Sequence, residues 1–213
     1  MNTPDLRRYD NSWYKPGRSS LTRAAWFFAG LPLLRSALMP SSAVRRTLLR
    51  LFGARIGAGV VIKPGVRVKY PWLLEVGDHT WIGEDAWLDN LALISIGSNV
   101  CISQGVYICT GNHDWTDPAF ALRVERVSIA DGAWIGAAVV LCPGVEIGPC
   151  AVASAGSVVN RNLKPYTVYG GNPAVEIKAR TVRPNGVGEI FSPTPLRGLT
   201  TSVAPARNLP TGS

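Results

Sequence analysis

An aliphatic residue recurs at every sixth position over long stretches of the chain, and this spacing limits the possible folds more than any other feature of the sequence. The clearest run is Ile129, Ile135, Leu141 and Ile147. Glycine often follows the aliphatic residue, and a small or β-branched residue stands four positions after it. A period of six matches neither the alternation of a half-buried strand nor the turn of a helix. It does match a short strand followed by a tight bend, and three such units close a triangular coil.

Coils of eighteen residues would place Ile129 and Ile147 above one another, so that the aliphatic side chains stack into a continuous dry core. Hydrogen bonds between parallel strands would set the rise at about 4.8 Å per coil. The sequence therefore predicts an all-β fold, a parallel β-helix of about five triangular coils, over residues 56–180.

The repeat is interrupted in three places. Two additions of two residues, between Val68 and Val76 and between Leu88 and Ile96, predict small insertions at corners of the coil. The third interruption is much longer and predicts an excursion loop over roughly residues 111–126. Long loops on rigid scaffolds often carry function, so this loop is the first place to look for a site.

The segments on either side of the repeat differ from it in composition. Residues 1–55 contain ten of the 22 Lys and Arg residues but two of the 14 Asp and Glu residues, so the net charge of +8 belongs to this segment. It is predicted to be a basic amphipathic helical segment, with one or two helices over residues 20–52 broken at Pro32 and Pro40. Residues 181–213 are rich in proline and glycine and predict a disordered tail.

The N-terminal segment also bears on partners and location. Its arginines alternate with leucines and with Trp26, Phe27 and Phe28, which favours a helix at a membrane surface or at a trimer edge over nucleic-acid binding. The apolar run Ala24–Leu34 has about 11 residues, short of the roughly 20 that span a membrane. We therefore expect a cytoplasmic protein, with no nucleic-acid partner, that can contact the inner face of the membrane peripherally.

The spacing of cysteine and histidine does not indicate a metal site. The four cysteines include no C-x-x-C pair and are expected to be reduced thiols; they are Cys101, Cys109, Cys142 and Cys150. A γ-type carbonic anhydrase shares a prism of this kind but needs three histidines for each zinc ion. Two histidines per chain supply six in a trimer, whereas three such sites need nine, so this class is excluded and no metal is expected.

Each of the two histidines can be weighed separately. His79 occupies a turn position of a regular six-residue unit and is interpreted as an exposed turn residue. His113 stands at the root of the long loop, in the stretch Gly111-Asn112-His113-Asp114-Trp115. The loop position makes His113 the candidate for catalysis.

Residues 53–180 resemble the colanic acid biosynthesis acetyltransferase group of the hexapeptide-repeat acyltransferases, which is related to the maltose and galactoside O-acetyltransferases. The resemblance implies that the coils wind left-handed. The stretches that carry it are Lys63-Pro64-Gly65-Val66, Tyr70-Pro71-Trp72, Trp81-Ile82-Gly83-Glu84, Cys101-Ile102-Ser103-Gln104-Gly105, Cys109 to Trp115 and Gly171-Asn172-Pro173-Ala174.

The resemblance implies that His113 is the general base for acetyl transfer from acetyl-CoA to a sugar hydroxyl. The chemistry suits a neutral imidazole, whose ordinary pKa of about 6.5 lets it accept a proton at cellular pH. Asp114 is a candidate to orient the imidazole, although a backbone carbonyl would serve equally well. The resemblance also implies an acceptor-binding or oxyanion-supporting amide at the second corner insertion. Asn90 is preferred there over Asp89.

Aligning the repeats with the family implies six contacts to the coenzyme. Small side chains would leave room for the slim pantetheine arm and expose backbone amides, while basic side chains, with Arg180 as a further candidate, would pair with phosphates. Val175 stands where the family usually has a basic residue. The implied contacts are Trp134, Ala137, Ala155, Asn160, Arg161 and Lys178.

The leading hypothesis is an acetyl-CoA-dependent O-acetyltransferase acting on a sugar hydroxyl in exopolysaccharide or cell-surface polysaccharide biosynthesis. The resemblance implies a homotrimer with three sites at subunit interfaces, and a lipid-linked sugar would suit a membrane-facing helix. Transfer to a different hydroxyl or to an amine remains an alternative. A non-catalytic β-helix scaffold is the other alternative, but it predicts regular faces without an excursion loop.

Overall fold

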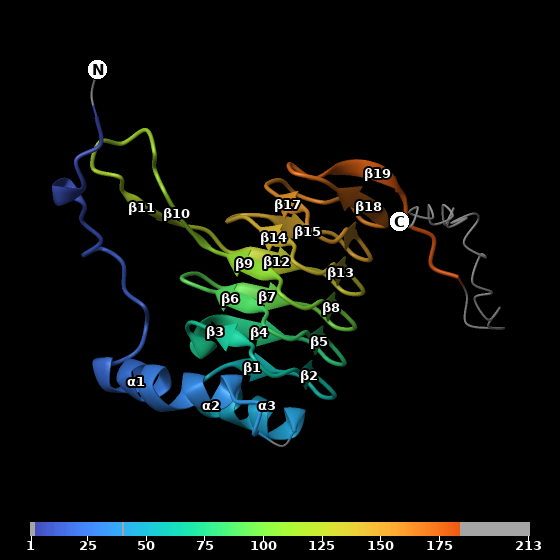
Figure 1. Ribbon diagram of the computed structural model, residues 1–213, viewed down its shortest axis with the longest axis horizontal. Helices are drawn as coiled ribbons and strands as arrows, with labels where there is room; N and C mark the ends of the chain where they lie inside the picture. Colours follow the sequence, from blue (N-terminus) through green and yellow to red (C-terminus); the bar gives the residue numbers. More distant parts are fainter. Residues whose placement is uncertain (1–2, 40, 184–213) are drawn as a thin grey trace, which may run out of the picture. The chain divides into compact units, whose positions relative to one another are not determined.

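The computed structural model describes residues 3–39 and 41–183 of the chain (Figure 1). The chain divides after Thr181, and the described residues up to that point form one compact unit. The tail predicted for residues 181–213 lies outside the described residues, apart from its first three.

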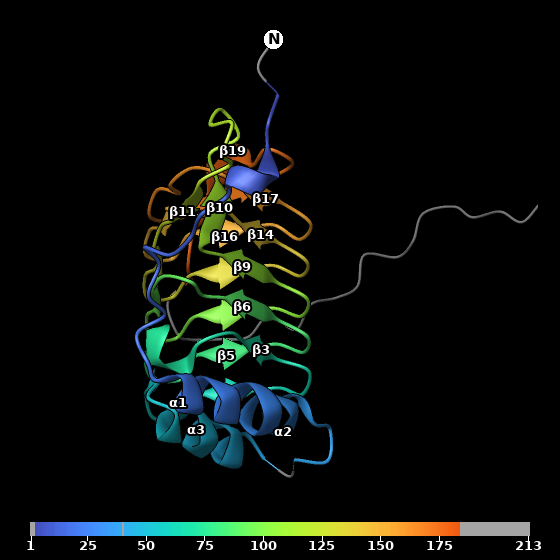
Figure 2. The ribbon, with the colours of Figure 1, turned by 90° about the vertical axis from the view of Figure 1, so that its left-hand side faces the viewer.

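The compact unit is built around a mostly parallel β-solenoid of about six turns, which confirms the predicted parallel β-helix with about one turn more than the predicted five (Figures 1 and 2). Its first face holds β1 (Arg55–Ile56), β4 (Leu74–Val76), β7 (Ile94–Ile96), β12 (Val127–Ile129) and β15 (Glu146–Ile147). The second face holds β2 (Val61–Ile62), β5 (Trp81–Ile82), β8 (Cys101–Ile102), β13 (Trp134–Ile135), β16 (Val152–Ala153), β18 (Thr167–Gly170) and the antiparallel β19 (Val175–Ala179). The third face holds β3 (Arg67–Val68), β6 (Trp87–Asp89), β9 (Tyr107–Cys109), β14 (Val140–Leu141) and β17 (Val158–Val159).

The six-residue spacing produces the core because the strands of successive coils pair in register. On the second face Ile62 lies opposite Ile82, Ile82 opposite Ile102, and Ile102 opposite Ile135, and all four are buried. Burying one such side chain contributes about 1.5–3 kcal/mol. The stack of aliphatic residues is therefore both the main source of stability and the feature that fixes the register.

Equivalent corners of the coils adopt a left-handed backbone, which accounts for His79. This residue has φ of +56°, and Gly59 and Asn99 hold the same conformation in the coils on either side. Asparagine and glycine are the residues that adopt this region most readily. The imidazole of His79 packs over Gly59 so closely that no Cβ would fit there. His79 is thus a turn residue, as the sequence indicates.

The N-terminal helices agree with the prediction only in part. One helical run comprises α1 (Ser20–Ala25), the π-turn η2 (Trp26–Gly30) and α2 (Leu31–Arg35), and α3 (Ser42–Leu51) follows it. Pro32 does not break this run, contrary to the prediction. The wide turn before it, closed by the bond from Leu31 N to the carbonyl of Trp26, accommodates a residue that has no N–H to donate. No helix among the described residues is long and apolar enough to cross a membrane.

These helices cover the free edge of the first coil. Its carbonyl groups would otherwise have no partner, because no further coil lies below. Arg46 donates to the carbonyl of Val60 at 2.6 Å, and the indole of Trp26 donates to that of Val68 at 3.0 Å. The guanidinium of Arg50 similarly bonds the carbonyls of Ile56 and Gly57. Some of the basic side chains of the N-terminal segment therefore stabilise the fold by bonding these carbonyl groups.

Residues 3–19 precede the predicted helices and contain one short helical turn, η1 (Leu6–Arg8). They run along the solenoid from the excursion loop to α1, held by three bonds between distant parts of the chain. The amide of Asp5 donates to the carbonyl of Pro118 at 2.8 Å, and the hydroxyl of Tyr14 to that of Leu91 at 2.7 Å. Trp72 donates to the carbonyl of Pro16 at 2.5 Å.

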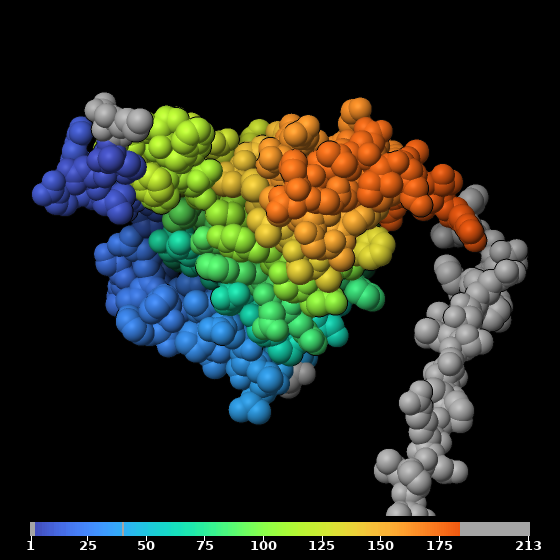
Figure 3. All heavy atoms as spheres, turned by 45° about the horizontal axis from the view of Figure 1, so that its top comes forward, coloured from blue at the N-terminus to red at the C-terminus, as the bar shows by residue number. Residues whose placement is uncertain are grey.

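The excursion loop is a two-stranded hairpin of β10 (Gly111–His113) and β11 (Leu122–Val124), paired antiparallel. It leaves the solenoid at the corner between the third and first faces, since β9 precedes it and β12 follows it. The N-terminal segment lies against it, as the blue and yellow-green atoms of Figure 3 show. A rigid hairpin therefore carries His113 away from the body of the solenoid.

Candidate active site

The imidazole of His113 is held in one orientation by a backbone carbonyl. Nδ1 lies 2.9 Å from the carbonyl oxygen of Phe120, across the hairpin. A carbonyl only accepts, so the proton of the neutral ring belongs on Nδ1. Nε2 is then left with a lone pair, which is the arrangement that a general base requires.

Two aromatic rings flank this imidazole. The ring of Phe120 stacks on it with centroids 4.4 Å apart and planes 10° apart. The ring of Tyr9, in the N-terminal segment, has its centroid 5.5 Å from that of the imidazole. The side chain of His113 stays partly exposed. The N-terminal segment thus contributes a wall of the candidate site, a role for which the sequence offers no motif.

Phe120 has a left-handed backbone, with φ of +53°. This conformation costs an aromatic L-residue about 1–2 kcal/mol. The surrounding turn holds it there, because Phe120 N donates to the carbonyl of Asp117 at 2.8 Å and Ala119 N to the side chain of Asp117 at 2.9 Å. The turn thereby aims the carbonyl of Phe120 back at His113.

Asp114 does not orient the imidazole. Its carboxylate accepts from the backbone and hydroxyl of Thr116 and forms an ion pair with Arg123. The bonds from Thr116, with Arg123 nearby, lower the pKa of this carboxyl below its usual value. Asp114 therefore fastens the hairpin, and the backbone carbonyl that the sequence left as an alternative holds His113.

Asn90 is fully buried, and its side-chain amide forms hydrogen bonds with the backbone of the coil below. Its Oδ1 accepts from Tyr70 N at 2.9 Å, and its Nδ2 donates to the carbonyls of Tyr70 at 2.7 Å and Leu73 at 2.9 Å. Both amide hydrogens are thus used to fix the first corner insertion. The structure gives this side chain no access to an acceptor, contrary to the preference for Asn90 over Asp89.

Asp89 lies at the same corner, and its side chain is 13% exposed. Its carboxylate lies 2.9 Å from Nζ of Lys69 and 3.2 Å from the hydroxyl of Tyr107. Burial, with Cys109 and this carboxylate nearby, raises the pKa of Tyr107. Asp89 also lines a cavity of about 560 Å³ between the third face and the N-terminal helices, here called the third-face cavity.

Four of the six implied coenzyme contacts lie together. A groove of about 610 Å³, here called the second-face groove, is lined by Trp134, Ala137, Ala155 and Lys178, and also by Arg180. Asn160 and Arg161 follow β17 on the third face and do not line it. Val175 begins β19 opposite Gly170, is exposed, and is also absent from the lining.

The second-face groove is lined partly by small apolar side chains, and it contains backbone N–H groups that form no hydrogen bond within the described residues. The amides of Ala137 and Ala155, in adjacent coils, donate to no acceptor among the described residues. The indole of Trp134 is about half exposed and donates to the hydroxyl of Ser103 at 3.0 Å. Lys178 and Arg180 place positive charge at the groove. These features suit a narrow amide-containing chain that ends in phosphates.

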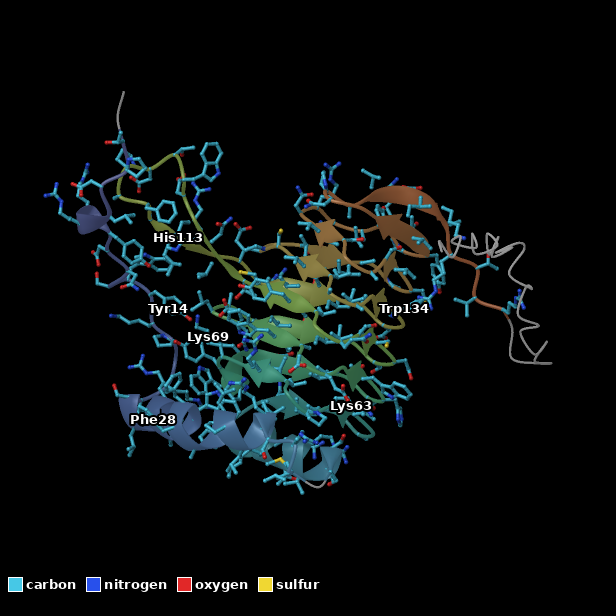
Figure 4. All side chains as sticks on the ribbon, in the orientation of Figure 1. Tyr14, Phe28, Lys63, Lys69, His113 and Trp134 are labelled. Carbon is cyan, nitrogen blue, oxygen red and sulfur yellow. The ribbon has the colours of Figure 1, made fainter. Side chains whose placement is uncertain are left out.

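The groove and His113 lie on opposite sides of the solenoid (Figure 4). The topology explains this separation, since the hairpin leaves at the corner between the first and third faces, whereas Trp134 belongs to the second. One copy of the chain therefore does not bring its own groove to its own histidine. Among the described residues no group of three His, Cys, Asp or Glu side chains could hold a metal ion.

Comparison with known proteins identifies the family. The chain is 44% identical over 136 residues to the protein named "Putative colanic acid biosynthesis acetyltransferase WcaF" from Escherichia coli (strain K12), and the match spans 64% of this chain and 75% of that protein. The chain belongs to this hexapeptide-repeat acetyltransferase family. No protein-family model matches it.

Solved structures of hexapeptide-repeat acetyltransferases have the same fold. One, from Vibrio cholerae O1 biovar eltor and complexed with acetyl coenzyme A, superposes with a TM-score of 0.71 at 27% identity, over 78% of this chain and 92% of that chain. A maltose O-acetyltransferase from Clostridium difficile 630 gives 0.69 at 27% identity, over 77% and 90% of the two chains. The histidine hairpin and the second-face groove therefore stand on a solenoid that other acetyltransferases share.

Proposed function

We propose that the protein transfers an acetyl group from acetyl-CoA to a sugar hydroxyl in the synthesis of an exopolysaccharide or cell-surface polysaccharide. The observation that carries the proposal is the imidazole of His113, which bonds the carbonyl of Phe120 through Nδ1 and leaves Nε2 to accept a proton. Family membership and the second-face groove support the same reaction.

In the proposed reaction Nε2 of His113 takes the proton of the acceptor hydroxyl as its oxygen attacks the thioester carbon. The carbon–sulfur bond then breaks, the acetyl group stays on the acceptor oxygen, and the proton returns to the departing sulfur of coenzyme A. The carbonyl of Phe120 stabilises the transient imidazolium, because its bond to Nδ1–H strengthens when the ring is charged.

The second-face groove is the proposed coenzyme site. The free amides of Ala137 and Ala155 face the pantetheine arm, the indole of Trp134 lies beside it, and Lys178 and Arg180 pair with the phosphates. Asn160 and Arg161 lie on another face and would reach the coenzyme only from a second subunit. The relative from Vibrio cholerae that holds acetyl coenzyme A supports this ligand.

The second-face groove and His113 lie on opposite sides of one chain, so acetyl transfer between them requires more than one subunit. A catalytic unit needs the groove of one subunit beside the hairpin of the next, and a closed ring of three satisfies every such head-to-tail contact. We therefore propose a homotrimer with three sites between subunits.

A second contact is proposed for the N-terminal helices. Leu21, Phe28 and Leu38 are 80%, 77% and 92% exposed, and arginines stand among them. Phe28 lies on the outer side of the helical run (Figure 4). Exposed apolar side chains with cationic side chains near them in the sequence suit the interface of an anionic membrane. We place the protein in the cytoplasm, peripheral to the inner face of the membrane, which co-sedimentation with anionic vesicles tests.

The function is tested by incubating the purified protein with acetyl-CoA and a panel of free, nucleotide-linked and lipid-linked sugars. Released coenzyme A thiol gives the rate, and mass spectrometry detects an acetyl group on an oxygen of the product. An acetylated amine in place of a hydroxyl would favour the alternative acceptor class. A failure to acetylate any acceptor would contradict the proposal.

A further inference from the structure

The coenzyme and the base proposed above leave the third-face cavity without an assigned ligand. Its floor is the third face, where Lys69 and Asp89 stand one coil apart, and Trp87 lies beside Asp89 on the same strand. Its other wall is the helical run, from which Arg23 and Phe27 face it. The cavity is thus a partly apolar space between two rigid elements.

The charges around this cavity do not balance. Arg23, Arg67 and Lys69 line it together with a single carboxylate, that of Asp89. Lys69 is paired with Asp89 at 2.9 Å. Neither arginine forms an ion pair within the part of the chain that the structure describes, which leaves two positive charges unmatched.

Both arginines are held in place by neutral partners. The guanidinium of Arg67 lies 4.5 Å from the centroid of the Trp87 ring, and that of Arg23 donates to the hydroxyl of Ser20 at 3.1 Å. Planar guanidinium groups that are preorganised and carry no carboxylate partner bind phosphate oxygens well. Two such charges match the charge of a diphosphate ester.

The cavity lies on the side of the solenoid from which His113 acts. The hydroxyl of Tyr107 in the next coil bonds Asp89 at 3.2 Å, and two residues beyond that strand the chain enters the hairpin of His113. Figure 4 shows His113, Tyr14 and Lys69 on one side and Trp134 on the other. An acceptor anchored in the cavity therefore lies on the same side as the histidine of its own subunit, away from the coenzyme groove of that subunit.

We propose that the third-face cavity binds the diphosphate of a glycosyl diphosphate acceptor, with Arg23 and Arg67 as its phosphate ligands. This inference rests on the proposed function and names its substrate class. Trp87 and Phe27 supply an apolar surface beside the phosphates, for a nucleoside base or for the first units of a lipid chain. Either source carries the same diphosphate chemistry.

Binding of inorganic pyrophosphate tests the site without any turnover. Because coenzyme A itself contains a diphosphate, the full-length protein is first saturated with it, and pyrophosphate is then titrated by calorimetry. The variant Arg23→Gln/Arg67→Gln should bind pyrophosphate about tenfold more weakly or worse, since two charge-assisted bonds are lost. Lys63→Gln removes one exposed charge from the second face, outside both the groove and the cavity, and should leave binding unchanged.

Arg23→Gln alone serves if the double variant unfolds, because Arg23 lies on the helical run outside the solenoid. It should give an intermediate loss of affinity. No binding of pyrophosphate to the coenzyme-saturated protein, or equal binding by the wild type and a folded variant, overturns the site.

Acceptor assays then distinguish the two sources. The same sugar is offered free, as a nucleoside diphosphate ester and as a polyprenyl diphosphate ester. A kcat/KM for either ester at least about tenfold above that for the free sugar, lost in the double variant, supports the proposal. Equal use of the free sugar overturns it. Pyrophosphate binding without any acetyl transfer would leave the anion site standing and overturn the acceptor assignment together with the proposed function.

Discussion

Replacing His113 with alanine removes the proposed base while leaving the coenzyme groove intact, because His113 is not among the residues that line the second-face groove. General-base catalysis contributes about 10²- to 10⁴-fold, so kcat should fall by about that factor. The KM for acetyl-CoA and the oligomeric state should stay close to those of the wild type. The assay is thiol release under single-turnover conditions, where the chemical step and not product release sets the rate.

The pH dependence gives an independent readout of the same group. Nε2 accepts the hydroxyl proton only while the imidazole is neutral, so kcat/KM of the wild type should fall on the acid side as the ring becomes protonated. His113→Ala has no such group, and its residual rate should lack this acid limb. If His113 had only a structural role, the His113→Ala variant would have a lower kcat/KM but would keep the fall on the acid side.

The matched control is the other histidine. His79 has φ of +56°, so asparagine, which tolerates this region, is a better replacement than alanine. His79→Asn should keep nearly full activity. If His113→Ala retains more than about a third of the wild-type kcat when chemistry limits turnover, the general-base assignment is wrong.

The coenzyme groove, the buried amide and the assembly can each be tested separately. Lys178→Ala/Arg180→Ala should raise the KM for acetyl-CoA about tenfold or more through loss of phosphate contacts, and an unchanged KM would show that the coenzyme lies elsewhere. Asn90→Ala should lower the free energy of unfolding by roughly 2–4 kcal/mol, since buried backbone groups lose their partners; a thermal melt with an unshifted midpoint would contradict this. Light scattering should give the mass of three chains, and a fully active monomer would refute the site between subunits.

The solenoid could be predicted because its information is local and repeated. Each aliphatic residue, such as Ile102 or Ile135, occupies the same environment as its counterpart in the next coil, so the spacing reveals the coil directly. The path of residues 3–19 could not be predicted in this way. It depends on single bonds to distant carbonyls, such as that of Tyr14 to Leu91, which leave no periodic pattern.

The residues of the candidate site likewise fall into those that the sequence identifies and those that it does not. His113 can be identified from its residue type and its place in the one long interruption of the repeat. The group that orients it cannot, because a backbone carbonyl in a left-handed turn at Phe120 has no signature of its own. The choice between Asp89 and Asn90 depends on which of two adjacent side chains points inward. A corner insertion removes the register that would have decided it.

The arginines of the N-terminal segment show why net charge alone misleads. Arg45 is buried and donates to the carbonyls of Leu34, Ser36 and Met39, while Arg46 and Arg50 cover carbonyls at the edge of the first coil. These side chains use their donors within the fold and have few left for a ligand. Arg23 contacts one hydroxyl and faces a cavity. Binding of an anion is therefore to be sought where the guanidinium groups have no carboxylate partner and few bonds within the fold, and among these residues that is the third-face cavity.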